Sequence, residues 1–238
     1  MTVVLDLESG AVVFVGNGKG ADELKPSWKQ LRPSRARIEA VAKGMSAAYR
    51  QAVAAELPKA VIVFDHFHVI KLFNEKLSDP RRELYREATD VQQKAVLKGV
   101  RWLLLKNPEN LEVEKDEKRR LKEALKLNEP LAAAYYLKED LRRFWEQPGR
   151  RFATTFLDGW IRRAEASGIK VVQQMARTLA AHRSGLLAYY DVMISSGPME
   201  GTNNKIKVMK RQAYGFRDRE FFKLKILAIH ETKYALVG

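Results

Sequence analysis

Residues 197–227 read GPMEGTNNKIKVMKRQAYGFRDREFFKLKIL, a helical stretch that opens on Pro198 and breaks once, at Tyr214-Gly215. Glu200 stands in the first turn, where an acid commonly does no more than compensate the helix dipole. The side chains that follow favour a functional interpretation, because cations bind phosphates and aromatic rings set among them can stack on exposed bases. These residues are Lys205, Lys207, Lys210, Arg211 and Arg217, with Tyr214 and Phe216. The stretch predicts a nucleic-acid-binding helix that carries one acid near its start.

The composition of the whole chain also favours a polyanionic partner. Lys and Arg number 43 against 29 Asp and Glu, so the formal net charge is +14 and the pI about 9.9. This balance alone does not separate DNA from RNA. The absence of cysteine excludes disulfides, zinc ribbons and iron–sulfur clusters, so any metal must be held by oxygen or imidazole. No apolar run of about 18 residues is present, and we expect a soluble cytoplasmic protein without a membrane partner.

The first part of the chain alternates between strand and helix patterns. Thr2–Glu8 and Ala11–Val15 are rich in β-branched residues and predict a hairpin. Ile38–Val41 is a short strand candidate, Met45–Ala55 reads as an alanine-rich helix, and Ala60–Phe64 reads as a buried strand. This alternation predicts an α/β fold with a mixed sheet.

From about Val69 to Tyr190 the apolar residues recur with a helical period, and β-branched clusters are almost absent. Pro80 and later Pro and Gly residues mark helix ends, which leaves roughly five or six helices. We therefore expect residues 1–68 and 192–238 to form one α/β core, with residues 69–191 as a helical insertion. The large aromatic residues of the insertion fit helical packing better than a ligand cage: Trp102, Tyr135, Tyr136, Phe144, Trp145 and Trp160.

A second motif follows the last predicted strand. The segment LPKAVIVFDHFHVIKLFN, residues 57–74, places Asp65 at the strand's carboxyl end and His68 three residues later. A carboxylate at that position is well placed to face a cleft. On chemistry alone a plainer interpretation stays open, in which Asp65 caps the next helix and His68 packs against it.

Taken in order, TVVLDLESG at residues 2–10, the segment at 57–74 and the segment at 197–227 resemble the DDE-type transposases of bacterial insertion sequences, specifically the ISL-three group. The resemblance covers nearly the whole chain. It implies a ribonuclease-H-like mixed sheet interrupted by a large α-helical insertion. It further implies three carboxylates around two Mg²⁺ ions that support cleavage and strand transfer of DNA at transposon ends. Oxygen ligands and Mg²⁺ suit a cysteine-free site.

Carried over residue by residue, the resemblance gives an incomplete set of acids. Glu200 matches the third acid. The second acid is expected where Gly44 stands, and in an alternative alignment Asp65 is that second acid; Glu200 and Asp65 are then the metal ligands. Otherwise Asp65 and His68 form an associated element that supports the site. The first acid is expected upstream of this chain, and Asp6, on the next strand, is a weaker catalytic candidate that suits the hairpin better.

Three functions remain open at this point. The first is a DNA transposase catalytic domain that is truncated and inactive, since two-metal chemistry needs all its ligands. The second is a DNA-binding remnant that represses or pairs with an intact transposase, or forms a homo-oligomer. The third is a basic RNA-binding helical protein unrelated to transposition, against which the ordered motifs argue. In the first two, DNA phosphates are expected to contact the cations of residues 205–217.

Overall fold

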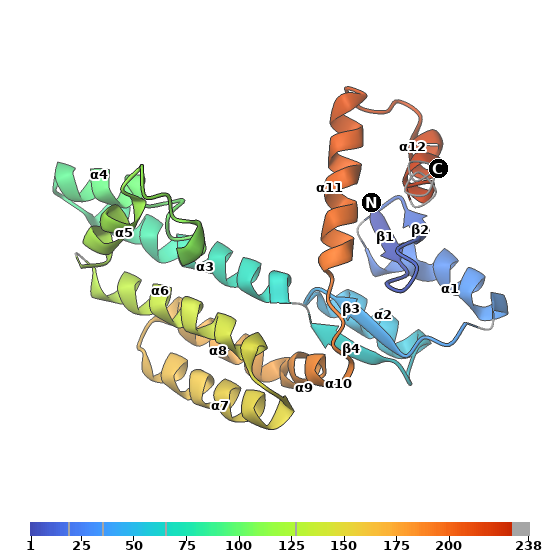
Figure 1. The fold of residues 1–238 in the computed structure, drawn as a ribbon, viewed down its shortest axis with the longest axis horizontal. Coiled ribbons are helices and arrows are strands. Elements are labelled where there is room, and N and C mark those ends of the chain that lie inside the picture. The colour runs from blue at the N-terminus through green and yellow to red at the C-terminus, as the bar shows by residue number, and fades with distance from the viewer. Residues whose placement is uncertain (19, 35, 65, 127, 230–238) are drawn as a thin grey trace. The chain divides into compact units, whose positions relative to one another are not determined.

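The computed structural model describes residues 1–18, 20–34, 36–64, 66–126 and 128–229. The chain divides into two compact units, one formed by residues 1–63 with 194–238 and the other by residues 64–193 (Figure 1). The first unit contains the described strands apart from the last residue of β4, and the described elements of the second are helices. The α/β class is therefore confirmed. None of the helices in the described ranges is long and apolar enough to cross a membrane.

An antiparallel hairpin opens the chain. β1 (Thr2–Leu5) pairs with β2 (Val12–Gly16), and Val4 lies opposite Phe14. The register shifts between Val4 and Leu5. The predicted strand to Glu8 is therefore too long, because Asp6 already begins the turn: its backbone carbonyl accepts a hydrogen bond from Gly10 N. Gly10 has a φ of +74°, which a residue without Cβ adopts at little cost.

A second pair of strands follows. β3 (Ala40–Lys43) pairs with β4 (Val61–Phe64), and α2 (Ala47–Glu56) connects them, as the sequence pattern predicts to within a few residues. Before β3, the chain forms the 3-10 turns η1 (Ala21–Leu24) and η2 (Arg32–Ser34) around α1 (Lys25–Leu31). The described strands thus make two two-stranded sheets and do not join into the single mixed sheet expected. The ribonuclease-H-like arrangement stays a prediction.

Two helices from the carboxy-terminal part complete this unit. α11 (Gly197–Gln212) and α12 (Arg219–Leu227) follow each other, and Figure 1 shows α12 beside the hairpin, in agreement with its contacts to β2. The shared core holds four buried residues, Val12, Val15, Phe222 and Ile226. Partly buried residues pack against it: Val3, Leu5, Ile206, Met209, Phe216 and Ile229. The two ends of the chain therefore build one core, which fixes the position of α11 relative to the hairpin.

The second unit contains eight described α-helices, more than the sequence predicts. They are α3 (His66–Glu87), α4 (Val91–Gly99), α5 (Glu117–Lys126), α6 (Glu129–Arg142), α7 (Arg150–Ala166), α8 (Lys170–Ala181), α9 (Arg183–Leu187) and α10 (Tyr189–Val192), with 3-10 turns η3 (Pro108–Asn110) and η4 (Arg143–Glu146). Helices α3, α6, α7 and α8 pack side by side (Figure 1). The excess comes partly from the short α9 and α10, because the backbone at His182 leaves helical geometry without any Pro or Gly signal.

The expectation that Pro80 ends a helix is wrong. α3 runs without interruption from His66 to Glu87 and contains Pro80 in its interior. Proline lacks the N–H that the carbonyl of Lys76 would accept, so one hydrogen bond of the helix is missing there. The apolar positions Phe73 and Leu77 are fully buried immediately before it. Tertiary packing of that face outweighs the local preference for a helix end.

The core of this unit confirms part of the aromatic prediction. Trp160 and Phe144 are fully buried, and Tyr135 is buried, whereas Trp102 is 63% exposed and Tyr136 60% exposed. The indole Nε1 of Trp160 donates to the carbonyl of Leu137, 2.8 Å away. Helical spacing therefore predicted burial for residues within the packed helices. It failed for Trp102, which lies in a turn after α4, and for Tyr136, on an outward position of α6.

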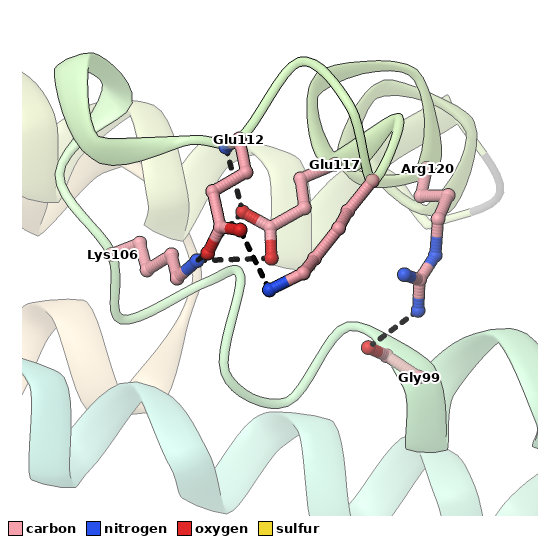
Figure 2. A network of polar contacts seen from close by, with 6 residues as sticks. Gly99, Lys106, Glu112, Glu117 and Arg120 are labelled. Atoms are coloured by element: carbon pink, nitrogen blue, oxygen red, sulfur yellow. Dashed lines mark hydrogen bonds and ion pairs between the residues drawn. The ribbon is translucent and has the colours of Figure 1, made fainter.

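The connection between α4 and α5 is held by polar contacts (Figure 2). The ammonium of Lys106 lies between two carboxylates, those of Glu112 and Glu117. Arg120 of α5 donates to the carbonyl of Gly99 at the end of α4, 3.3 Å away. The irregular segment is thereby joined to the start of α5, α5 is joined directly to the end of α4, and the buried carboxylate of Glu117 has partners.

Candidate functional site

α11 carries an exposed basic surface. Ile206 and Met209 pack against the core cluster, and the other faces of the helix are exposed and mostly polar, with Val208 as an exception. Within the described part of the chain, no lysine or arginine of residues 205–217 pairs with a carboxylate. Lys207 Nζ donates to Asn204 Oδ1, 3.3 Å away. Unpaired exposed ammonium and guanidinium groups are available to phosphates. We call this set the α11 basic surface: Lys205, Lys207, Lys210, Arg211 and, in the turn after the helix, Arg217, all of them exposed.

Glu200 lies in the first turn of the same helix. The turn is fixed by Pro198 near its start, by the hydrogen bond from Glu200 N to the carbonyl of Ser196, and by the Thr202 hydroxyl, which donates to the carbonyl of Pro198. The Glu200 carboxylate is exposed, and its position favours interaction with the helix dipole. The side chain is available to a ligand, although its catalytic role remains a prediction.

Asp6 is engaged in the hairpin turn. Its carboxylate accepts from the backbone N–H groups of Glu8 and Ser9, at 3.2 and 3.3 Å, and also from the Ser9 hydroxyl. Carboxylates of Asp commonly stabilise turns in this way. These contacts give Asp6 a structural role in the hairpin turn. Its place as a catalytic candidate stays a prediction.

Gly44 follows β3 directly, in the position that the resemblance assigns to the second acid. Beside it, the half-buried Lys43 donates from Nζ to the carbonyls of Gly44 and Ser46, 2.7 and 3.0 Å away. Burial, and secondly the positive charge of Arg50, lower the pKa of Lys43 to about 8. Where a carboxylate was expected, the structure therefore has a glycine and a neighbouring cation.

The motif at residues 57–74 is only partly described by the structure. Asp65 lies outside the described residues. His68 is exposed in the first turn of α3, and two positions earlier the ring of His66 packs against Trp145, with centroids 4.7 Å apart. The sequence pattern drew attention to His68 and not to His66. The packing of His66 against Trp145 joins residues far apart in the sequence, so the pattern could not predict it.

The described side chains do not assemble a metal centre. Within the described ranges, no group of three or more His, Asp and Glu residues could hold an ion. Glu200 is exposed on α11, and the Asp6 carboxylate is used by the hairpin. The fit of two Mg²⁺ ions therefore finds no support among the described residues, and the ions stay a prediction of the resemblance.

Comparison with known proteins identifies the family. Residues 1–226 match the family model described as a transposase, of the DDE type and ISL-three group. The chain belongs to this transposase family. It is 37% identical over 232 residues to the transposase for insertion sequence element IS1001 of Bordetella parapertussis, which covers 95% of this chain and 56% of that protein. It is 30% identical over 240 residues to the transposase for insertion sequence element IS1557 of Mycobacterium tuberculosis, which covers 91% and 53%.

No solved structure matches the chain significantly. The chain spans about half the length of the curated relatives that it matches. Membership of the transposase family is thus established over nearly all of this chain. The activity of a complete transposase does not follow from this match and stays a proposal.

Sequence reasoning missed one feature of the site in this transposase-family chain. It noted the glycine at position 44 but not the hydrogen bonds of Lys43, since a lysine at a strand end ordinarily points into water. The sequence did contain a signal, because the carbonyls of Gly44 and Ser46 follow Lys43 closely enough for its ammonium to fold back and reach them.

Proposed function

We propose that this chain is the catalytic region of a DDE transposase that retains DNA binding and has lost strand cleavage. The α11 basic surface carries the first half of the proposal. Its cations are exposed and, within the described residues, free of carboxylate partners, so phosphates can replace water and counterions around them. DNA, specifically the ends of an insertion sequence, is the proposed partner, and the cytoplasm is the proposed location.

The second half rests on Gly44. In the aligned position glycine offers no ligand, so the site lacks one of the negative charges that divalent ions would need. Two-metal phosphodiester chemistry stabilises both the attacking and the leaving oxygen, and it fails when its ligands are incomplete. Mg²⁺ would require Glu200 and Asp65 as its remaining ligands, so we expect weak metal binding and cleavage reduced by orders of magnitude.

DNA binding is tested by its dependence on salt. A duplex carrying an element end is titrated with the 238-residue chain at several salt concentrations, and the logarithm of the association constant is plotted against that of the salt concentration. Lys210→Gln should flatten the slope by about one unit. The matched control is Lys118→Gln, an exposed cation of α5 in the other unit, which should leave the slope unchanged. An unchanged slope for Lys210→Gln contradicts the assignment.

Cleavage is tested separately with the same duplex. We expect no Mg²⁺- or Mn²⁺-dependent nicking by the unaltered chain under conditions in which it binds the duplex. Metal-dependent nicking that Glu200→Gln abolishes would overturn the proposed loss of activity and would establish Glu200 as a catalytic residue. Gly44→Asp is the corresponding gain-of-function variant, expected to strengthen Mn²⁺ binding in a calorimetric titration.

A second candidate function follows from two features together. The α11 basic surface is intact, whereas Gly44 stands at the position expected for an acid. A chain that binds element ends without cutting them would compete with, or pair with, an active transposase and repress it. Coexpression with an active relative should then lower the excision of a reporter element. Neutralising Lys210 and Arg211 together should restore excision, whereas Lys118→Gln should not.

A further inference from the structure

Tyr214 is held in an unusual position between α11 and α12. Its side chain is fully exposed, at 101% of the reference area, and its backbone has a φ of +50°. A residue other than glycine in this left-handed region carries a conformational cost, and a bulky aromatic one is uncommon there. Gly215 follows with a φ of +99°, so two successive residues turn the chain out of the helix.

The turn is fixed before and after Tyr214. Before it, Ala213 N donates to the carbonyl of Met209, 3.2 Å away. Gly215 N donates to the carbonyl of Lys210, 2.9 Å away, which closes the end of α11. One residue further on, the ring of Phe216 stacks on Phe222, with centroids 4.5 Å apart and planes inclined by 16°. Phe222 belongs to the buried core cluster of this unit. These hydrogen bonds anchor both neighbours of Tyr214, Ala213 and Gly215, and the described residues make no contact that buries its ring.

Positive charge surrounds the exposed ring along the chain. Lys210 and Arg211 precede it, Arg217 and Arg219 follow it, and all four are exposed. The nearest acid in sequence, Asp218, is occupied as the cap of α12, where it accepts from Glu220 N and Phe221 N at 2.9 and 3.0 Å. Cations on both sides of a rigidly presented aromatic ring favour a nucleic-acid base over an apolar protein surface.

We propose that Tyr214 stacks on an unpaired base of the bound nucleic acid, so that the chain prefers DNA with single-stranded nucleotides over fully paired duplex. This inference rests on the proposed DNA-binding function of the α11 basic surface and adds a second kind of contact to it. Phosphate contacts alone do not distinguish DNA with unpaired bases from fully paired duplex, because both present phosphates. A ring can stack on a base only where the face of that base is not already covered by its neighbours.

The test compares two probes with the full 238-residue chain. One is a blunt duplex, and the other is the same duplex with a single-stranded thymine tail; both are fluorescently labelled. The wild-type chain should bind the tailed probe more tightly by about fivefold to a hundredfold, the range that stacking of one base supplies. Tyr214→Phe keeps the ring and should keep this preference.

Tyr214→Asn is the decisive variant, because asparagine tolerates the left-handed backbone and lacks the ring. It should melt at or above the wild-type temperature, bind the blunt duplex as before and lose the preference for the tail. Tyr136→Ala, at a 60% exposed tyrosine of α6, is the matched control and should retain the preference. Equal binding of both probes by the wild type, or an unchanged preference in Tyr214→Asn, overturns the proposal.

Two further outcomes are distinguishable. If the wild-type chain binds neither probe, the proposed DNA-binding function fails, and the stacking proposal fails with it. If Tyr214→Asn leaves both affinities unchanged but alters the sedimentation of the free protein, the ring serves a protein contact and the stacking proposal is wrong.

Discussion

The ammonium of Lys106 lies 2.7 Å from Oε2 of Glu117, and the same carboxylate oxygen accepts from Glu112 N, 2.9 Å away. Glu117 is the first residue of α5, and its side chain is 9% exposed (Figure 2). One carboxylate thus joins the connection after α4 to the start of the next helix. Its protonation should loosen that connection.

The first prediction concerns acid stability. The backbone N–H of Glu112, and then the ammonium of Lys106, hold the pKa of Glu117 below its ordinary value of 4.5. Because the folded-state pKa is the lower one, the stabilisation is complete above about pH 4.5 and is lost as the pH falls through the folded-state pKa. The difference in unfolding free energy between the wild type and Glu117→Gln should therefore shrink on acidification. A difference that does not depend on pH would contradict this role.

The second prediction concerns the helical core. Trp160 is fully buried, bonds to the carbonyl of Leu137 and meets Phe73 edge to face, with centroids 5.9 Å apart. Trp160→Ala should lower the unfolding free energy by about 3–5 kcal/mol, and Trp160→Phe by less, because part of the ring volume remains. Tyr136→Ala, on an exposed position, should change it by about 0.5 kcal/mol or less. Denaturant titration measures all three.

The third prediction concerns the hairpin. Asp6→Ala removes an acceptor from two backbone N–H groups and should cost about 1 kcal/mol of unfolding free energy. Asp6→Asn keeps an acceptor oxygen and should cost clearly less. Equal losses in both variants would show that the negative charge matters and not the turn geometry.

The fourth prediction concerns Lys43. Because burial lowers its pKa to about 8, its amine should become neutral, and reactive toward an acylating reagent, at a lower pH than an ordinary lysine with a pKa of about 10.4. Labelling followed by mass spectrometry gives the midpoint of reactivity against pH for each lysine. Arg50→Gln removes the second cause and should raise the midpoint of Lys43. An unmoved midpoint would leave burial as the whole explanation.

The strands of the first unit were predictable because their signals are local. β-branched runs and nearby turn residues marked β1, β2 and β4 to within a few residues. The pairing into two separate sheets was not predictable in this way. It depends on which strands meet in space, and short runs such as β3 and β4 carry no information about their partners.

The candidate site shows the same limit. The pattern of α11, with Pro198 at its start and cations behind Glu200, predicted both the helix and its exposed charges. The sequence predicted a break in the helix at Tyr214-Gly215 but not the left-handed backbone of Tyr214. Gly215 indicates a turn, but it does not indicate which side chain the turn exposes. Pro80 misled for a related reason, because packing of α3 overrides its average preference for a helix end. Trp102 misled because it lies in an exposed turn, where helical spacing does not predict burial.

The core shared by Val12, Val15, Phe222 and Ile226 has a consequence for biosynthesis. Its members come from segments on either side of the helical unit, which is itself one continuous segment. A two-stranded hairpin by itself is at best marginally stable in water. On the ribosome, the helical unit can therefore fold as soon as it emerges, while the hairpin waits for α12 to be synthesised. The nascent segment that carries the hairpin is exposed to chaperones and proteases throughout that interval.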